Sequence, residues 1–312
     1  MNRTVRVSRC IAVAAVIATA SIGMTAAPTS ARTTATYPVK TRFTGPGPFA
    51  TTTGTVLNAS GNAVYDLFYP ADYASLGFKS PIITWGNGTN AVPSMYTKLL
   101  THFASYGFTV IASTLLNTGS GREIDFGAHY LIAQDRRAGS VFKGRLAVNQ
   151  VAAVGHSQGA GGATRATTYD PGTIKALLTF SLPNTKLVGA NPDCPTAADC
   201  MFDPSLLTRP TFFVSTHGRI DSLIASPTTE AAFFDSVPGP AAIGIIERSG
   251  GTVADHSTIQ DPANGGKPGG FLGYATAWLE YQLLGNRKAA AAFTGAHPEI
   301  AANTDWPGSA VK

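Results

Sequence analysis

A serine flanked by glycines, in the sequence GHSQG at residues 155–159, constrains this chain more than any other feature. The apolar run 151–154 precedes it directly, and the small residues 160–163 follow it. A strand that turns sharply into a helix around a serine is the setting of a nucleophile elbow. Side chains at the two glycine positions would collide with the neighbouring strand and helix, which accounts for the glycines. The alternative is an ordinary glycine-rich turn.

Short apolar runs alternate with helical patterns from about residue 60 to residue 285. Strands separated by helices require crossover connections, so we expect an α/β fold with a mostly parallel central sheet and helices on both faces. The expected strands are residues 63–69, 81–85, 108–113, 151–154, 176–180, 211–215 and 242–246. The expected helices are residues 94–106, 124–138, 226–237 and 273–284.

The first 31 residues have the order of a secretory signal peptide. A basic segment (1–9) precedes an apolar run (10–23), and small residues stand at 29–31. A membrane anchor is the alternative, but the apolar part is shorter than the ~20 residues that a span needs. We therefore expect residues 1–31 to be removed, the protein to be secreted, and residues 32–312 to form a single domain.

The net charge argues against binding to nucleic acid. Lys and Arg number 23 and Asp and Glu 18, a formal charge of +5. Without Arg3, Arg6 and Arg9 of the leader, 20 basic residues face 18 acidic ones, or +2. A charge this small gives no strong preference for phosphate or anionic lipid. We expect a monomer with no nucleic-acid partner and no further membrane span.

Two cysteines, Cys194 and Cys200, stay in the chain after the leader. An even pair in an exported protein predicts a short-loop disulfide. A metal site is the alternative, but a structural zinc ion takes four ligands and two thiolates have no third ligand nearby. We therefore expect a disulfide and no metal.

A serine nucleophile needs a base and an acid that orients the base. In chain order the acid and then the histidine follow the elbow. His256 follows the last expected strand, and Asp221 follows strand 211–215, so both belong at the carboxyl edge of the sheet. Asp255 is the rival for the acid, although adjacent residues rarely orient each other's rings. The other histidines are His102, His129, His156, His217 and His297.

An oxyanion hole needs two donors near the serine. One is the backbone N–H of Gln158, which follows the serine directly. The other is the backbone N–H of Asn87 in the turn WGNGT (85–89), where glycines leave room for a substrate. The alternative for this segment is a plain turn between a strand and a helix.

Five stretches carry a family resemblance: WGNGT (85–89), VGHSQGAGGATRA (154–166), GRIDSLIAS (218–226), ADHSTI (254–259) and YATAWLEYQLL (274–284). Over residues 49–293 the chain resembles secreted bacterial α/β-hydrolases of the cutinase and polyester hydrolase kind, and also the chlorophyllase-like and dienelactone-hydrolase-like groups. The resemblance implies an α/β-hydrolase catalytic domain with the triad Ser157, Asp221 and His256. It also implies Asn87 and Gln158 as the oxyanion hole, and it calls for no cofactor.

Two departures from that family concern the substrate. Polyester-degrading cutinases carry a Trp where residues 180–184 read FSLPN, and they usually have Met where Gln158 stands. We therefore expect short aliphatic esters to be better substrates than bulky terephthalate esters. Other aromatic residues could replace the missing wall: Trp85, Tyr96, Phe126 and Tyr130.

The sequence thus predicts a secreted serine carboxylesterase that acts on small or polymer-surface esters. One alternative is an amide or lipid hydrolase that uses the same site. Another is a non-catalytic protein that binds wall polymer on a hydrolase scaffold. A serine-directed inhibitor distinguishes the enzyme from the binding protein.

Overall fold

The computed structural model describes residues 36–188, 194 and 196–312. The predicted signal peptide and its cleavage site lie outside these residues, and so does the predicted start of the domain at residue 32. The residues from Thr36 to Lys312 group together by their mutual contacts. Within the described segments, no helix combines the length and the apolar character needed to cross a membrane.

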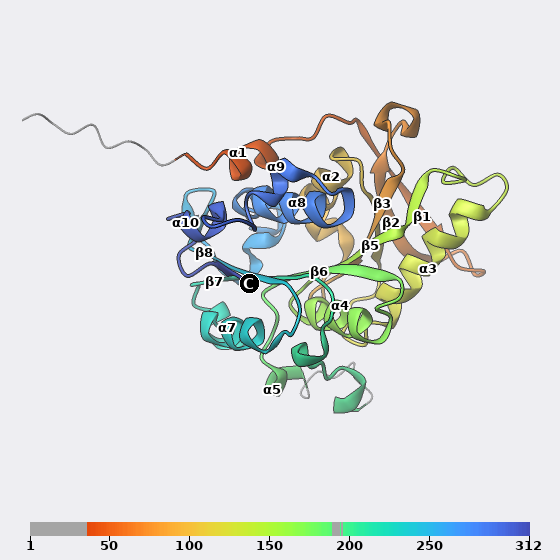
Figure 1. Ribbon diagram of the computed structural model, residues 1–312. Helices are drawn as coiled ribbons and strands as arrows, with labels where there is room; N and C mark the ends of the chain where they lie inside the picture. Colours follow the sequence, from red (N-terminus) through yellow and green to blue (C-terminus); the bar gives the residue numbers. More distant parts are fainter. Residues whose placement is uncertain (1–35, 189–193, 195) are drawn as a thin grey trace, which may run out of the picture. The chain divides into compact units, whose positions relative to one another are not determined.

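The main sheet of the described chain has nine strands (Figure 1). They are β1 (Thr51–Leu57), β2 (Ala63–Pro70), β3 (Ser80–Gly86), β4 (Thr109–Ser113), β5 (Leu146–His156), β6 (Ile174–Phe180), β7 (Thr211–Thr216), β8 (Ala241–Ile246) and β11 (Ala310–Val311). Their spatial order is β1-β2-β4-β3-β5-β6-β7-β8-β11. In this spatial order, each pair of neighbours from β4 through β3 to β8 is parallel. Strands β1, β2 and β11 pair antiparallel with their neighbours at the two edges of the sheet. The short strands β9 (Arg248–Ser249) and β10 (Thr252–Val253) form a separate hairpin.

Helices cover both faces of this sheet. The helices are α1 (Pro38–Thr44), α2 (Thr97–Ser105), α3 (Arg122–Arg136), α4 (Gln158–Tyr169), α5 (Thr185–Val188), α6 (Asp221–Ile224), α7 (Pro227–Ser236), α8 (Gly269–Leu284), α9 (Arg287–Ala290) and α10 (Glu299–Ala302). Buried residues of α1, α2 and α8 pack on one face, and those of α3, α4 and α7 pack on the other (Figure 1). This is the arrangement of the α/β-hydrolase fold, as the sequence predicts.

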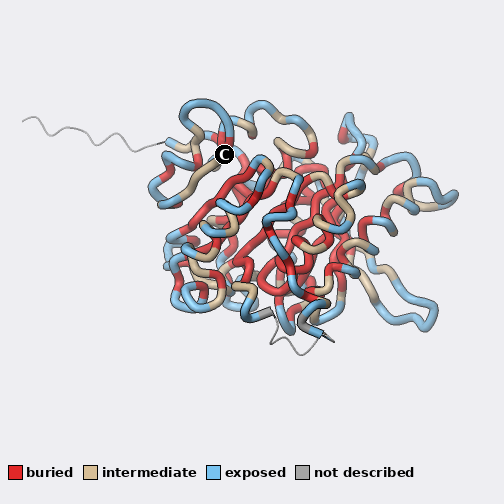
Figure 2. Tube along the Cα trace, turned by 60° about the horizontal axis from the view of Figure 1, so that its bottom comes forward, coloured by how far each residue is buried: buried red, intermediate tan, exposed pale blue. Residues whose placement is uncertain are grey.

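The core divides into two layers because successive strand residues point to opposite faces. In β3, Ile83 and Trp85 join the layer under α2 and α8, whereas Ile82 joins the layer under α3 and α4. All seven residues of β3 are buried, and Figure 2 shows the central strands as a continuous buried layer. Burial on both faces explains why these strands appear in the sequence as mostly apolar runs without regular alternation.

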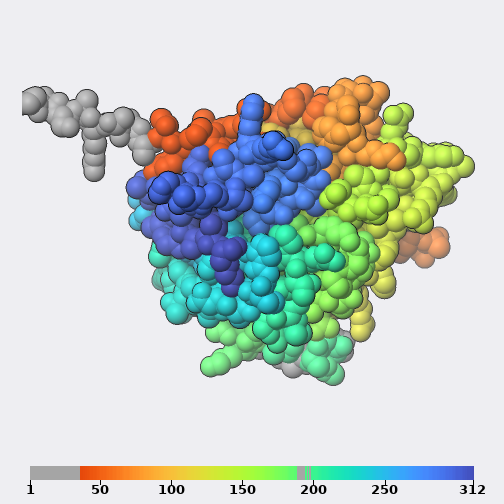
Figure 3. Space-filling view, in the orientation of Figure 1, coloured from red at the N-terminus to blue at the C-terminus, as the bar shows by residue number. Residues whose placement is uncertain are grey.

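Helix α1, near the start of the described chain, packs against segments from the end of the chain. The carboxylate of Glu299 accepts hydrogen bonds from the backbone N–H groups of Val39 at 2.7 Å and Lys40 at 2.8 Å, at the N-terminus of α1. A negative charge at this end of a helix is favourable because the free N–H groups and the helix dipole are positive there. Figure 3 shows the segments around α8 and α9 beside those around α1.

The structure adds elements that the hydrophobic pattern does not indicate. Strands β1 and β11 are edge strands whose residues are partly or fully exposed, so they lack the buried runs of the central strands. The predicted helix 94–106 begins later, because a 3₁₀ turn at Pro93–Tyr96 precedes α2. The other expected strands and helices are present, with ends shifted by a few residues.

Candidate active site

Ser157 lies in the sharp turn between β5 and α4. Its backbone adopts φ +54° and ψ −123°, a region that costs a residue with a side chain about 1–3 kcal/mol. The N–H of Ser157 donates to the carbonyl of Phe180 at 2.8 Å, and the N–H of Ala160 donates to the Ser157 carbonyl at 2.9 Å. These bonds from β6 and α4 hold the strained turn and fix the direction of the serine side chain.

Glycines surround this turn because backbone segments approach one another closely. A Cβ atom at Gly155 would lie 2.2 Å from the carbonyl oxygen of Gly159, and one at Gly159 would lie 2.3 Å from Gly86. A Cβ atom at Gly162 would lie 1.9 Å from the carbonyl oxygen of Thr118. The contacted atoms belong to the backbone, so no side-chain rotation would relieve the overlap. The glycines of GHSQG therefore serve close packing, as the sequence indicates.

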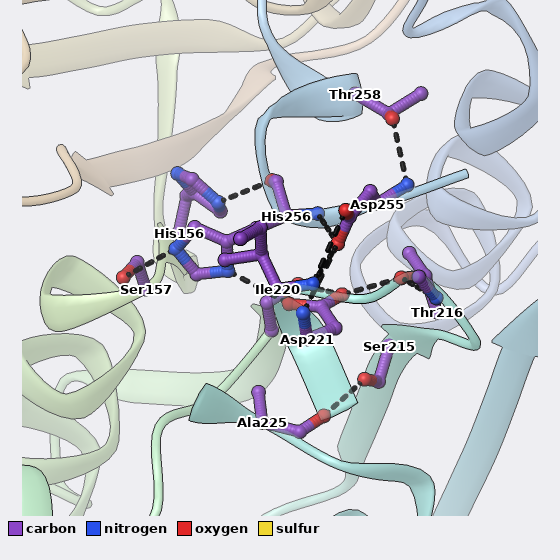
Figure 4. Close-up of polar contacts among 12 residues, drawn as sticks. His156, Ser157, Ser215, Thr216, Ile220, Asp221, Ala225, Asp255, His256 and Thr258 are labelled. Carbon is purple, nitrogen blue, oxygen red and sulfur yellow. Dashed lines mark hydrogen bonds and ion pairs between the residues drawn. The ribbon is translucent and has the colours of Figure 1, made fainter. Parts of the chain in front are cut away.

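A chain of hydrogen bonds connects Ser157, His256 and Asp221 (Figure 4). The His256 Nδ1 atom lies 2.7 Å from Asp221 Oδ1, and His256 Nε2 lies 2.9 Å from Ser157 Oγ. A carboxylate accepts hydrogen bonds only, so Nδ1 carries the proton and Nε2 accepts from the serine hydroxyl. The three residues come from separate elements: the β5–α4 turn, the 3₁₀ turn His256–Ile259, and the start of α6.

Two further hydroxyl groups orient the carboxylate of Asp221. Its Oδ2 atom accepts hydrogen bonds from Ser181 Oγ at 2.9 Å and Thr216 Oγ1 at 2.7 Å. Asp221 is fully buried, so these bonds replace the water that an exposed carboxylate would have. Neither residue was predicted from the sequence. Their signal is a hydroxyl residue at the carboxyl end of each neighbouring strand, Thr216 ending β7 and Ser181 following β6.

Asp255 holds the backbone and does not touch the histidine ring. Its Oδ1 atom accepts from the N–H groups of Ile220 at 2.9 Å, Asp221 at 3.0 Å and His256 at 2.8 Å. Desolvation alone would raise the pKa of Asp255, but these hydrogen bonds and the nearby His256 bring it below its ordinary value. An ionised Asp255 therefore joins the loop of the acid to the loop of the histidine.

A second buried carboxyl group lies behind Asp221. Glu230 of α7 is fully buried, and its Oε1 atom accepts from the N–H of Leu182 at 2.8 Å. Its Oε2 atom has no hydrogen-bond partner among the described residues. Burial, together with the charge of Asp221, raises the pKa of Glu230 well above its ordinary value. A neutral Glu230 can support the segment after β6 without adding a second negative charge beside Asp221.

The two predicted oxyanion donors come from the elbow and from the turn after β3. A Cβ atom at Gly159 would lie 2.4 Å from the Asn87 carbonyl oxygen, so the turn after β3 packs directly on the start of α4. The buried Asn87 side chain accepts from Trp85 Nε1 at 2.9 Å and donates to the Ser113 carbonyl, which fixes this turn. The N–H of Gln158 opens α4, where no earlier helical carbonyl accepts it.

The side chain of Gln158 points to a neighbouring loop. Its Oε1 atom accepts from the N–H of Thr118 at 2.7 Å, and its Nε2 donates to Asn117 Oδ1 at 2.8 Å. Cys200 and Gln158 both line a small hollow of about 170 Å³. The predicted disulfide between Cys194 and Cys200 is present, so the bridge is joined at Cys200 to the surroundings of the residue that follows the serine.

Three other histidines have separate environments. His102 is buried in α2, its Nε2 donates to the Phe43 carbonyl at 3.0 Å, and burial lowers its pKa to about 4. His129 lies on α3, 2.9 Å from Asp170 and 3.7 Å from Asp125. These two aspartates and His129 are the group within the described segments that could converge on a cation, but they already pair with one another. His156 lies beside His256, with the ring centres 4.8 Å apart.

Exposed apolar side chains occur in two segments that also contact or contain site residues. Leu115 and Leu116 follow β4, where the Leu115 carbonyl accepts from the side chain of Asn87 at 3.2 Å. Ile220 and Leu223 flank Asp221. The aromatic residues Trp85 and Tyr96 are fully buried, so neither provides a wall for a substrate.

Comparison with known proteins gives one family match. The sequence model of a family described as PETase, PET hydrolase-like, matches residues 26–280. This range contains every predicted site residue and both bridged cysteines. No match was found among curated proteins.

Proposed function

The chain belongs to the PET hydrolase-like family of α/β-hydrolases, which act on ester bonds, and from this premise we propose that it is a secreted serine carboxylesterase. The observation that carries the proposal is the uninterrupted chain of hydrogen bonds from Ser157 through His256 to Asp221. The elbow supports the same reading, because its strained backbone presents one serine to one histidine.

In the first half of the reaction Ser157 Oγ attacks the ester carbonyl carbon, and its proton passes to His256 Nε2. The 2.9 Å distance between these atoms is within reach for that transfer. Asp221 holds the imidazole through Nδ1 and stabilises its cation. The tetrahedral intermediate then breaks its bond to the alcohol, which leaves with the proton from His256, and an acyl-serine forms.

The carbonyl oxygen gains negative charge in this step. The backbone N–H groups of Asn87 and Gln158 are the proposed donors to it. In the second half of the reaction a water molecule attacks the acyl-serine while His256 takes its proton. Collapse of the second intermediate releases the carboxylic acid and returns the proton to Ser157.

Secretion is part of the proposal. The leader, residues 1–31, has the charge and apolar pattern of a signal peptide. The disulfide between Cys194 and Cys200 supports an oxidising compartment, since such bonds rarely persist in the cytosol. Mass spectrometry of the mature protein from the medium should give an N-terminus at Arg32.

We also propose that short aliphatic esters are preferred over bulky terephthalate esters. The exposed apolar side chains in the segments of Leu115 and Asp221 are aliphatic, such as Leu115 and Leu223, while Trp85 and Tyr96 are buried. An aromatic partner in a stacked pair adds about 0.5–1.5 kcal/mol, so its loss costs several-fold to tenfold in binding. Kinetics on a butyrate ester and on bis-hydroxyethyl terephthalate test this, and a higher kcat/KM on the terephthalate would contradict it.

The decisive experiment replaces the nucleophile. Ser157→Ala should abolish hydrolysis of p-nitrophenyl butyrate and labelling by a fluorophosphonate, because the members of a triad act as a unit. Ser60→Ala, an exposed serine in the turn before β2, is the control and should keep both. Full turnover by pure Ser157→Ala would refute the serine mechanism. Failure of the wild type to react with the fluorophosphonate would favour a binding protein.

A further inference from the structure

His156, the residue before the serine, lies between two loops that both face the site. Its Nε2 atom is 3.0 Å from the backbone carbonyl oxygen of His256, a contact drawn in Figure 4. Its Nδ1 atom is 2.8 Å from the hydroxyl oxygen of Tyr96. The two histidine rings also pack together with their centres 4.8 Å apart. His156 is almost fully buried.

These contacts have one consistent direction. A carbonyl oxygen accepts only, so Nε2 of His156 carries the proton and donates to His256. In a neutral ring Nδ1 then accepts, and the Tyr96 hydroxyl donates to it. Burial, reinforced by the neighbouring His256, holds the pKa of His156 well below its ordinary value, which keeps the ring neutral. The Tyr96 oxygen in turn accepts from the N–H of Gly88 at 3.2 Å.

Tyr96 is packed against the turn after β3 by two routes. Its ring lies 4.9 Å from that of Trp85, whose Nε1 donates to the side chain of Asn87. A Cβ atom at Gly88 would lie 2.9 Å from His156 Nδ1 and 3.1 Å from the Tyr96 hydroxyl oxygen. The turn after β3 is therefore closely packed against the side chains of Tyr96 and His156.

We propose that Tyr96 and His156 are positioning residues that fix the loop of the base (residues 254–259) relative to the loop of the oxyanion donor (residues 86–89). Both side chains are buried, so neither touches the substrate. The inference rests on the hydrolase function proposed above and identifies what aligns that site.

The reaction explains why the two loops must be aligned. Proton transfer to His256 and charge development at the substrate oxygen occur in the same step, so their atoms must be in place together. The two groups are 169 positions apart in the chain, at residues 87 and 256. His156 extends from the elbow itself and contacts both loops, through Tyr96 on one side and the His256 carbonyl on the other.

The test compares four variants by kcat and KM on p-nitrophenyl butyrate. Tyr96→Phe removes one hydroxyl, and His156→Leu removes both ring contacts. His156→Gln keeps a neutral donor and acceptor. Tyr106→Phe is the matched control, because the hydroxyl of this buried tyrosine directly after α2 lies between the Arg42 and Gly45 carbonyl oxygens, at 3.1 Å and 2.9 Å, and can donate to either.

We expect Tyr96→Phe to lower kcat about three- to tenfold and His156→Leu about ten- to hundredfold, with KM within about twofold of wild type. His156→Gln should recover most of the loss seen in His156→Leu. Tyr106→Phe should keep the wild-type kcat. Loss of folded protein would also lower the apparent kcat at an unchanged KM, so kcat is expressed per active site counted by fluorophosphonate labelling. On that basis a purely structural role would leave kcat at the wild-type value.

The proposal is overturned if Tyr96→Phe keeps the wild-type kcat, if Tyr106→Phe loses as much as Tyr96→Phe, or if His156→Gln is no better than His156→Leu. The hydrolase function fails by a different result, an unmodified protein that neither turns over the ester nor reacts with the fluorophosphonate. An active wild type with indifferent Tyr96 and His156 variants would thus reject the positioning role alone.

Discussion

A single methyl group at Gly218 should separate the loop of the acid from the loop of the base. Gly218 follows β7 and faces Asp255 across the gap between those loops. A Cβ atom there would lie 2.4 Å from Asp255 Cγ and Oδ1 and 2.5 Å from its Cα. Because the added Cβ atom would also overlap the Cα atom of Asp255, rotation of the Asp255 side chain cannot remove the overlap. The backbone at Gly218 or Asp255 must therefore move.

The size of that movement follows from the distances. Carbon atoms in contact lie at about 3.5 Å or more, so 2.4 Å requires a shift of about 1 Å. Asp255 binds the N–H of His256, so the imidazole moves with it. A misplacement of about 1 Å in a catalytic group can cost about 10²-fold in rate. We therefore expect Gly218→Ala to lower kcat about a hundredfold while the protein stays folded.

The effect of Gly218→Ala is measured by kcat on p-nitrophenyl butyrate and by the rate of fluorophosphonate labelling. The melting temperature shows whether the variant stays folded. Gly269→Ala is the matched control, because a Cβ atom there meets nothing within 4 Å among the described residues and the position opens helix α8. It should keep wild-type turnover. A Gly218→Ala protein with turnover within about threefold of wild type would show that the loops absorb the methyl group without moving His256.

Three further predictions concern other parts of the molecule. Asp221→Asn should lower kcat by about 10³–10⁴-fold because the amide cannot hold the working tautomer of the imidazole. Asp255→Asn keeps an oxygen that accepts from the backbone, so it should lower kcat less than about tenfold. Equal losses of kcat in the two variants would contradict the assignment of Asp221 as the acid. Burial lowers the pKa of His102 from 6.5 to about 4, so its contribution to the free energy of unfolding is full above about pH 6.5 and is lost as the pH falls toward 4, by up to about 3 kcal/mol. The melting temperature of His102→Gln should therefore fall less steeply with acid than that of the wild type. The same fall in both proteins would contradict this role of His102. The non-reduced protein should show no free thiol by mass spectrometry, and loss of the Cys194–Cys200 bridge should cost about 2 kcal/mol in chemical denaturation because the closed loop is short; a loss near zero would contradict the entropic argument.

The central fold could be predicted because burial leaves a direct trace in the sequence. Strands β3 and β7 are buried on both faces, so they appear as mostly apolar runs, with only Ser and Thr among their polar residues, that end where site residues begin. The carboxyl ends of parallel strands share one edge of a sheet. Asp221 and Ser157 each follow a parallel strand, so the sequence also predicts that they lie at the same edge. The antiparallel edge strand β1 has mostly exposed residues and little pattern to detect.

Contacts that depend on which strands are neighbours could not be predicted. Tyr96 fits the helical spacing of a core residue, and nothing in that spacing says that its hydroxyl meets His156. Glu230 is charged by type and would be expected in solvent, yet α7 places it in the core beside Asp221. Such polar contacts join distant parts of the chain, and no local periodicity encodes them.

The close packing at the elbow determines where this protein can vary. At Gly86, Gly155, Gly159 and Gly162 any added side chain meets backbone atoms, so random substitutions there should be removed from a library of active variants. The side chains of Leu115 and Leu223 are largely exposed, so substitutions there disturb little packing. Selection for a new ester should therefore accumulate changes at such exposed positions, and the glycines that stay unchanged would mark which residues are needed to keep the serine in place.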